Sequence, residues 1–163
     1  MTIGLVTYVR GGMNVSMTSM NLEPGNSYLF DTTVFIDVLR KHEAARKLFY
    51  QARFYPVSVG YSIITEAELW AGISEHKFRT VSQHTALLKP FRRYFINVTI
   101  ARRAGELRRL LTESGAVKKG QGPHLPDCII AATAEYYHLT VCSRDSGHFR
   151  LFAQFSISVL EYS

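Results

Sequence analysis

The sequence has few cysteines and no long hydrophobic run. Its two cysteines, Cys128 and Cys142, lack the Cys-x-x-Cys spacing of metal-binding pairs. No apolar run approaches the ~20 residues of a membrane-spanning helix. The apolar residues 3–9 are too few for a secretory signal peptide and lack a basic segment before them. We therefore expect a cytoplasmic protein without membrane contact, in which both cysteines are reduced core residues; a disulfide is the alternative.

Two catalytic patterns are also missing. A phosphatase of the Asp-x-Asp type needs a second aspartate two positions after the first, but Thr33 stands two positions after Asp31. A metal-free ribonuclease needs positioned histidines, and none of the six histidines forms a recognisable pair. Cleavage that resists a chelator would favour that second class.

Length and composition indicate one globular domain with a core of its own, because the chain has 163 residues, of which 47% are hydrophobic and 20% charged. Residues 1–27 differ from the rest, since they are rich in Gly, Asn, Ser, Thr and Met. Three interpretations of this extension stay open: residues 3–9 add an edge strand, the segment is disordered, or translation starts at Met17 or Met20.

Strand and helix patterns alternate along the remaining chain. Short apolar runs predict strands at residues 28–30, 56–59, 94–99, 139–143 and 156–160. Helical spacing predicts helices from residue 34 onward and at residues 42–52, 63–73, 77–88, 100–114 and 127–137, with a short turn at 149–152. This order favours an α/β fold with a central, mostly parallel sheet and helices on both faces.

Carboxylates recur where such a sheet binds ligands, beyond the carboxyl ends of its strands. Asp31 follows the first strand, and Asp127 opens a helix of about 16 Å. The return strand also covers about 16 Å, so Asp145 after it comes back near Asp127. Each has an ordinary explanation alone, since Asp31, for example, is a good helix cap.

A glutamate of the helix at residues 63–73 completes the predicted cluster. Glu66 and Glu68 do not share a helical face, so only one of them is expected to reach the cluster. Glu68 is the one that the family resemblance described below implies, although Thr65 and Glu68 also match a capping box. Oxygen ligands without organised His or Cys select Mg²⁺ or Mn²⁺, and such a site suits phosphodiester hydrolysis.

Basic residues surround this predicted acidic cluster. The chain has 19 Lys and Arg against 13 Asp and Glu, and without the four clustered acids the rest carries +10. A basic body around an acidic pocket suits a polyanionic substrate, although a merely basic soluble protein is an equal alternative. The candidate phosphate contacts are Arg144 and two lysines of the Gly- and Lys-rich loop 115–126, Lys118 and Lys119. The alternative is that this loop only connects two helices.

These residues resemble the PIN-domain ribonucleases, and most of all the VapC-type toxins of prokaryotic toxin–antitoxin pairs. The resemblance runs from residue 28 to about residue 160. Four segments carry it in the family's order: Asp31-Thr-Thr-x-x-Ile36, Ser62-x-x-Thr65-x-x-Glu68-Leu-x-x-Gly72, Asp127-Cys-Ile-Ile-Ala-Ala-Thr-Ala and Ser143-Arg-Asp-x-x-His-Phe149.

The resemblance implies a PIN-like fold and an endoribonuclease that depends on Mg²⁺ or Mn²⁺, is inhibited by a VapB-type antitoxin and is usually dimeric. It places the metal-binding and catalytic acids at Asp31, Glu68, Asp127 and Asp145, with supporting hydroxyl groups at Thr32 and Ser143. Residues 1–27 depart from the family, whose chains usually begin at the first strand, so the nuclease domain is expected at residues 28–163. The alternatives are a PIN nuclease of RNA maturation or quality control and a PIN-like module that binds RNA or protein without cleaving.

Overall fold

The computed structural model of the protein describes residues 21–73, 78–117, 122–144 and 146–163. In this part of the chain, five strands form one sheet in the order β3-β2-β1-β4-β5, and every neighbouring pair is parallel. The strands are β1 (Ser27–Phe30), β2 (Ser58–Ser62), β3 (Arg92–Tyr94), β4 (Thr140–Ser143) and β5 (Val159–Glu161). The predicted α/β fold with a parallel sheet is therefore confirmed.

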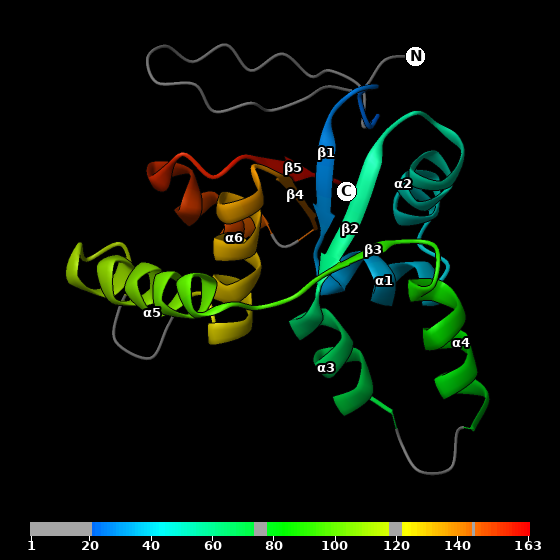
Figure 1. The fold of residues 1–163 in the computed structure, drawn as a ribbon, viewed down its shortest axis with the longest axis horizontal. Coiled ribbons are helices and arrows are strands. Elements are labelled where there is room, and N and C mark those ends of the chain that lie inside the picture. The colour runs from blue at the N-terminus through cyan, green and yellow to red at the C-terminus, as the bar shows by residue number, and fades with distance from the viewer. Residues whose placement is uncertain (1–20, 74–77, 118–121, 145) are drawn as a thin grey trace.

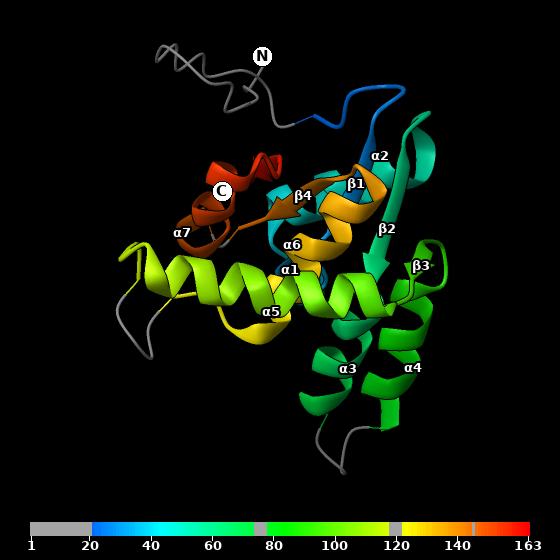
Figure 2. The ribbon, with the colours of Figure 1, turned by 60° about the vertical axis from the view of Figure 1, so that its left-hand side comes forward.

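Helices cover both faces of this sheet. One face carries α1 (Thr32–Leu39) and α2 (Glu43–Phe54), and the other carries α5 (Val98–Glu113) and α6 (Leu125–Tyr137) (Figure 1). Two further helices, α3 (Ile63–Ala71) and α4 (Phe78–Leu88), project side by side beyond the end of β2 in both views (Figure 2). The short α7 (Ser146–Phe149) and the 3-10 helix η1 (Arg150–Phe155) lead into β5.

The central strand β1 shows how the sequence builds two cores. Successive side chains of a strand point to opposite faces, so Tyr28 and Phe30 enter one core while Leu29 enters the other. The first core includes Phe35 of α1, and the second includes Ile100 of α5. Because helices cover both faces, the three buried residues of β1 are all apolar rather than alternating with polar residues.

Residues before β1 are part of the packed fold. Leu22 is 2% exposed and belongs to the same core as Phe30. Its backbone N–H donates to Oε1 of Gln51 over 3.1 Å, and the N–H of Glu23 donates to the hydroxyl of Tyr28 over 2.9 Å. The packed chain therefore starts before residue 28, whereas the interpretations proposed for residues 3–9 lie outside the described residues.

The strand predicted at residues 94–99 is wrong. β3 ends at Tyr94, and α5 already begins at Val98. The physical reason is the cap at Asn97, whose side chain accepts a hydrogen bond from the N–H of Ile100 over 2.9 Å. The strand predicted at 56–59 is displaced, because β2 occupies Ser58–Ser62.

Both cysteines are free and buried, so their prediction as reduced core residues is confirmed. Cys142 belongs to the core under α1 and α2 and Cys128 to the core under α5 and α6. The sheet separates them, which explains why they form no disulfide. Burial raises the pKa of the Cys128 thiol to about 11. None of the described helices combines the length and the apolar character that a membrane crossing needs.

Candidate active site

The strand order places a switch point beside β1. The chain proceeds from β1 to β2 and β3 on one side and then returns to β4 on the other side. Ligands of open parallel sheets bind at such a point, beyond the carboxyl ends of the strands. The strand ends are joined there, because the N–H of Asp31 donates to the carbonyl oxygen of Cys142 over 3.0 Å.

Asp31 lies directly after β1 and is 4% exposed. Its carboxylate accepts hydrogen bonds from the N–H of Thr32 over 2.7 Å, from the hydroxyl of Thr33 over 2.6 Å and from the hydroxyl of Ser143 over 2.8 Å. Asp31 therefore caps α1 and also lies beyond the carboxyl ends of the strands, where the sequence predicts a cluster of carboxylates. Burial is the main cause that raises the pKa of Asp31, and the charge of Asp127 raises it further against the lowering effect of the hydroxyl donors.

Glu68 reaches this edge from α3. The hydroxyl of Thr32 donates to its Oε2 over 2.5 Å, and that hydroxyl also lies 3.1 Å from the hydroxyl of Thr65. Burial is the largest cause of a raised pKa at Glu68, and the charges of Asp31 and Asp127 add to it. The capping-box interpretation is wrong, because α3 begins after Ser62 rather than at Thr65.

Glu66 lies elsewhere on the same helix. Its Oε2 is 2.9 Å from Nε of Arg93, and its Oε1 accepts a hydrogen bond from Nη2 of the same arginine over 3.3 Å. The choice of Glu68 over Glu66 is therefore consistent with where the two side chains point.

Asp127 lies in the first turn of α6, which begins two residues earlier than predicted. Its Oδ2 accepts a hydrogen bond from the N–H of His124 over 2.7 Å and lies 3.6 Å from Nδ1 of His148. The rings of His124 and His148 are in edge contact, with centroids 6.2 Å apart. The sequence reasoning missed these histidines, although His148 stands in the fourth motif and His124 three residues before Asp127.

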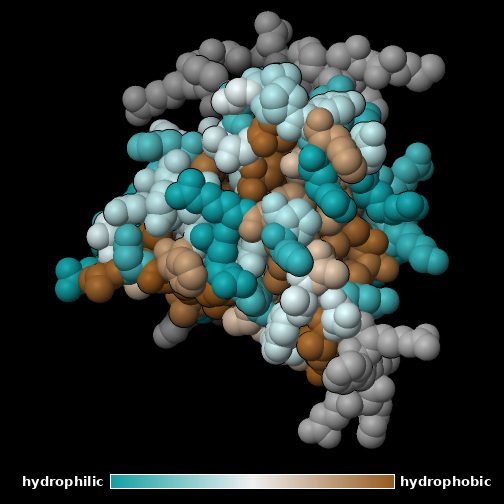
Figure 3. Space-filling model, turned by 45° about the vertical axis from the view of Figure 1, so that its right-hand side comes forward, coloured by the Kyte–Doolittle hydropathy of each residue, from teal (hydrophilic) through white to brown (hydrophobic). Residues whose placement is uncertain are grey.

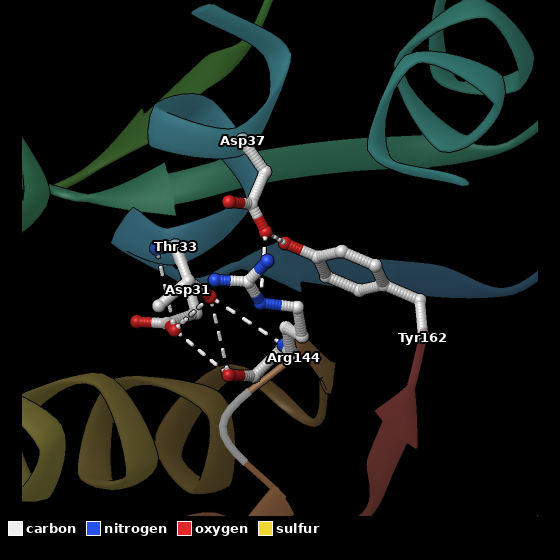
Figure 4. Close-up of polar contacts among 6 residues, drawn as sticks. Asp31, Thr33, Asp37, Arg144 and Tyr162 are labelled. Carbon is white, nitrogen blue, oxygen red and sulfur yellow. Dashed lines mark hydrogen bonds and ion pairs between the residues drawn. The ribbon is translucent and has the colours of Figure 1, made fainter. Parts of the chain in front are cut away.

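Arg144 follows β4 at the same edge. Its backbone N–H donates a hydrogen bond to the hydroxyl oxygen of Thr33 over 3.4 Å. Its side-chain Nε lies 3.2 Å from Oδ2 of Asp37. Figure 4 shows this side chain extending from the end of β4 toward Asp37 and Tyr162. Three predicted site residues, Asp145, Lys118 and Lys119, lie outside the described residues.

We call Asp31, Glu68 and Asp127 the acidic site. Asp127 raises the pKa of both other acids, so the three charges repel one another across a partly buried space. Among the described residues, no group of three acids, histidines or cysteines is arranged to hold a metal ion by itself. The donor chemistry of carboxylate oxygens fits a hard divalent cation, with Asp145 as the predicted fourth acid.

Comparisons with solved structures identify the fold. A chain from VapBC2 of Rickettsia felis, in complex with a promoter DNA fragment, matches with 18% identity and a TM-score of 0.71 over 84% of this chain and 99% of that chain. A DNA-bound VapBC from Salmonella typhimurium matches with 20% identity and a TM-score of 0.69, over 85% and 99%. A toxin–antitoxin complex from Klebsiella pneumoniae matches with 28% identity and a TM-score of 0.60, over 83% and 98%.

A search of curated proteins found no match. The family model described as "PIN domain" matches residues 28–153. That range holds β1 to β4, the acidic site and Arg144, so the family match and the geometry concern the same part of the fold. Because the match spans most of the chain, this protein belongs to the PIN domain family.

Proposed function

We propose that this protein is an endoribonuclease that depends on Mg²⁺ or Mn²⁺ and is the toxin of a VapBC-type toxin–antitoxin pair. The observation that carries the proposal is the convergence of Asp31, Glu68 and Asp127 at the switch point of a parallel sheet. The charge of Asp127 raises the pKa of both other acids there. Such repulsion is a cost that a bound cation removes. The nuclease domain is proposed at residues 28–163, and Leu22 and Glu23 of the preceding segment pack against it.

Each residue has a proposed role. Asp31, Glu68, Asp127 and Asp145 would hold the metal, which when bound polarises a phosphoryl oxygen and lowers the pKa of a bound water. Thr32 fixes Glu68 through the hydrogen bond to Oε2, and Ser143 fixes Asp31 through the hydrogen bond to Oδ2. Lys118, Lys119 and Arg144 would bind RNA phosphates.

Partners are proposed from the named neighbours and from the surface. The neighbours include toxin–antitoxin complexes, which supports a VapB-type antitoxin as partner in the cytoplasm. Hydrophobic residues reach the surface between hydrophilic ones on the side that carries α2 and α4 (Figure 3). Several large hydrophobic side chains are exposed to solvent, among them Phe54 (63% exposed), Phe95 (62%) and Val98 (65%). An antitoxin or a second copy of the chain would cover side chains of this kind. We propose a homodimer that binds the antitoxin.

Chelation tests the proposed activity. Purified protein, freed of any antitoxin, is expected to cleave single-stranded RNA in Mg²⁺ or Mn²⁺ and to leave 5′-phosphate and 3′-hydroxyl ends. EDTA should abolish the cleavage, and an excess of Mn²⁺ should restore it, because the proposed nucleophile is a water bound to the cation that the acidic site would hold. Cleavage that persists in EDTA, or products with cyclic phosphates, would show that another chemistry operates.

A further inference from the structure

A buried acid outside the acidic site pairs with Arg144. Asp37 lies on α1, six residues after Asp31, and is 1% exposed. Its Oδ2 accepts a hydrogen bond from the hydroxyl of Tyr162 over 2.9 Å and faces Nε of Arg144 at 3.2 Å. A buried carboxylate is costly without such partners, so the two contacts offset part of the cost of burying it.

Tyr162 links this pair to the end of β4, directly before Arg144. It follows β5 and is 3% exposed, and its N–H donates to the carbonyl oxygen of Ser143 over 3.3 Å. Tyr162 therefore contacts both the backbone immediately before Arg144 and the carboxylate that faces the Arg144 side chain. Figure 4 shows the second of these contacts. Burial raises the pKa of Tyr162 far above its ordinary value, so its hydroxyl stays protonated and donates.

The pair is asymmetric in its exposure. The Asp37 side chain is 2% exposed, whereas the Arg144 side chain is 44% exposed. The buried partner thus restrains a cation that remains accessible to a ligand. An arginine held in this way loses less conformational entropy when it binds a phosphate, and its planar fork matches phosphate oxygens.

The position of Arg144 beside the acidic site allows its guanidinium group to contact an RNA substrate. The N–H of Arg144 meets the hydroxyl of Thr33, which donates to Asp31, so Arg144 borders the acidic site. An RNA phosphate that approaches this site meets carboxylates, and a fixed cation at its border offsets part of the repulsion.

We propose that Asp37 and Tyr162 are positioning residues, which hold Arg144 in place to contact an RNA phosphate next to the acidic site. This inference rests on the proposed nuclease function, and it assigns Asp37 and Tyr162 a part in substrate binding although neither touches the substrate.

RNA binding by single and double variants tests the proposal. The probe is a short, fluorescently labelled single-stranded RNA, titrated in EDTA at several salt concentrations so that no cleavage occurs. Arg144→Gln should weaken binding by about tenfold, the size of one charge-assisted hydrogen bond. It should also lower the slope of log affinity against log salt by about 0.7, the value for one phosphate contact on a single strand.

Asp37→Asn gives the sharpest result, because charge alone and positioning predict opposite signs. Removing a negative charge from a protein that binds RNA would by itself raise the affinity. Positioning predicts that Asp37→Asn weakens binding by about fivefold and that Tyr162→Phe weakens it to a similar degree. In the Arg144→Gln background neither replacement should weaken binding any further.

Matched controls separate this role from general charge and from stability. Arg150→Gln removes an arginine whose side chain is 60% exposed and is paired with Glu161, and it should change neither affinity nor salt slope. Tyr136→Phe removes the hydroxyl of an exposed tyrosine and should also be silent. Melting temperatures of all variants show whether each one is folded.

The proposal is overturned if Asp37→Asn or Tyr162→Phe, in folded protein, leaves RNA affinity unchanged or raises it. It is also overturned if the effects of Asp37→Asn and Tyr162→Phe add fully to that of Arg144→Gln. The same holds if Arg150→Gln weakens RNA binding as much as Arg144→Gln does. If the unaltered protein cleaves RNA in Mg²⁺ while these variants behave in this way, the nuclease function stands and only the positioning role fails. If the unaltered protein neither binds nor cleaves RNA, both are wrong.

Discussion

Asp31→Asn is expected to reduce RNA cleavage by more than about a hundredfold, which is the upper range for residues that only support a metal ligand. Asp31 is the most buried acid of the acidic site, and it accepts hydrogen bonds from the next two residues and from Ser143 across the switch point. Asparagine keeps the shape and an accepting oxygen but removes the charge that a divalent cation requires. The measurement is the initial rate of RNA cleavage in Mn²⁺ at saturating metal.

A matched control for this change lies in α1, the helix that Asp31 caps. Asp37→Asn makes the same replacement at another buried acid, and it should weaken cleavage only several-fold through Arg144. If Asp31 were only the cap of α1, Asn would replace it well, since both are good caps. Near-normal cleavage by Asp31→Asn would therefore remove Asp31 from the proposed metal ligands.

Glu68→Gln and Glu66→Gln are expected to differ strongly, although the two residues lie two positions apart on α3. Glu68→Gln should lower the cleavage rate by more than about tenfold, because Glu68 receives the hydroxyl of Thr32 and is repelled by Asp31 and Asp127. Glu66→Gln should cost little activity, because Glu66 pairs with Arg93, whose side chain is 45% exposed.

Both glutamate variants need the same two measurements, the cleavage rate in Mn²⁺ and the melting temperature. Each is an uncharged amide of nearly equal size, so each serves as the control for the other. The opposite ranking, with Glu66→Gln the more damaged enzyme, would mean that Glu66 and not Glu68 serves the reaction.

Local patterns were sufficient to predict most of the fold. The apolar β1 run followed by Asp31, and the helical spacing after Asp127, depend on neighbouring residues alone, and both elements lie within two residues of their predicted bounds. The convergence of Asp31 and Asp127 followed from a general rule about parallel sheets rather than from any contact in the sequence. That is why these two acids could be predicted to lie at one edge of the sheet before the structure.

The failures involve short elements and long-range contacts. Residues 94–99 alternate weakly, and the cap signal of Asn97 outweighs that pattern, so α5 begins there instead of a strand. No periodicity links Asp37, Arg144 and Tyr162, because they are far apart in the chain and meet only when α1, β4 and β5 come together. Similarly, the contact of His148 with Asp127 depends on how α7 packs beside α6.

Strain in the metal-free protein is a further consequence of the acidic site. The pKa of Asp31 is raised in the folded protein, so its ionised form is less favourable there than in the unfolded chain. Stability therefore declines as the pH rises from the ordinary pKa of an aspartate through the raised value of the folded state, and the cost is fully present above that raised value. Metal-free Asp31→Asn should consequently melt at or above the temperature of the unaltered protein.

The melting temperature in Mn²⁺ tests the central claim, that these acids bind a divalent cation, most directly. A ligand that binds only the folded state stabilises it by about 2.7 kcal/mol at a hundredfold excess over its dissociation constant. The account predicts that Mn²⁺ raises the melting temperature of the unaltered protein clearly and that of Asp31→Asn much less. An equal rise in both proteins, or no rise in the unaltered protein, would contradict it.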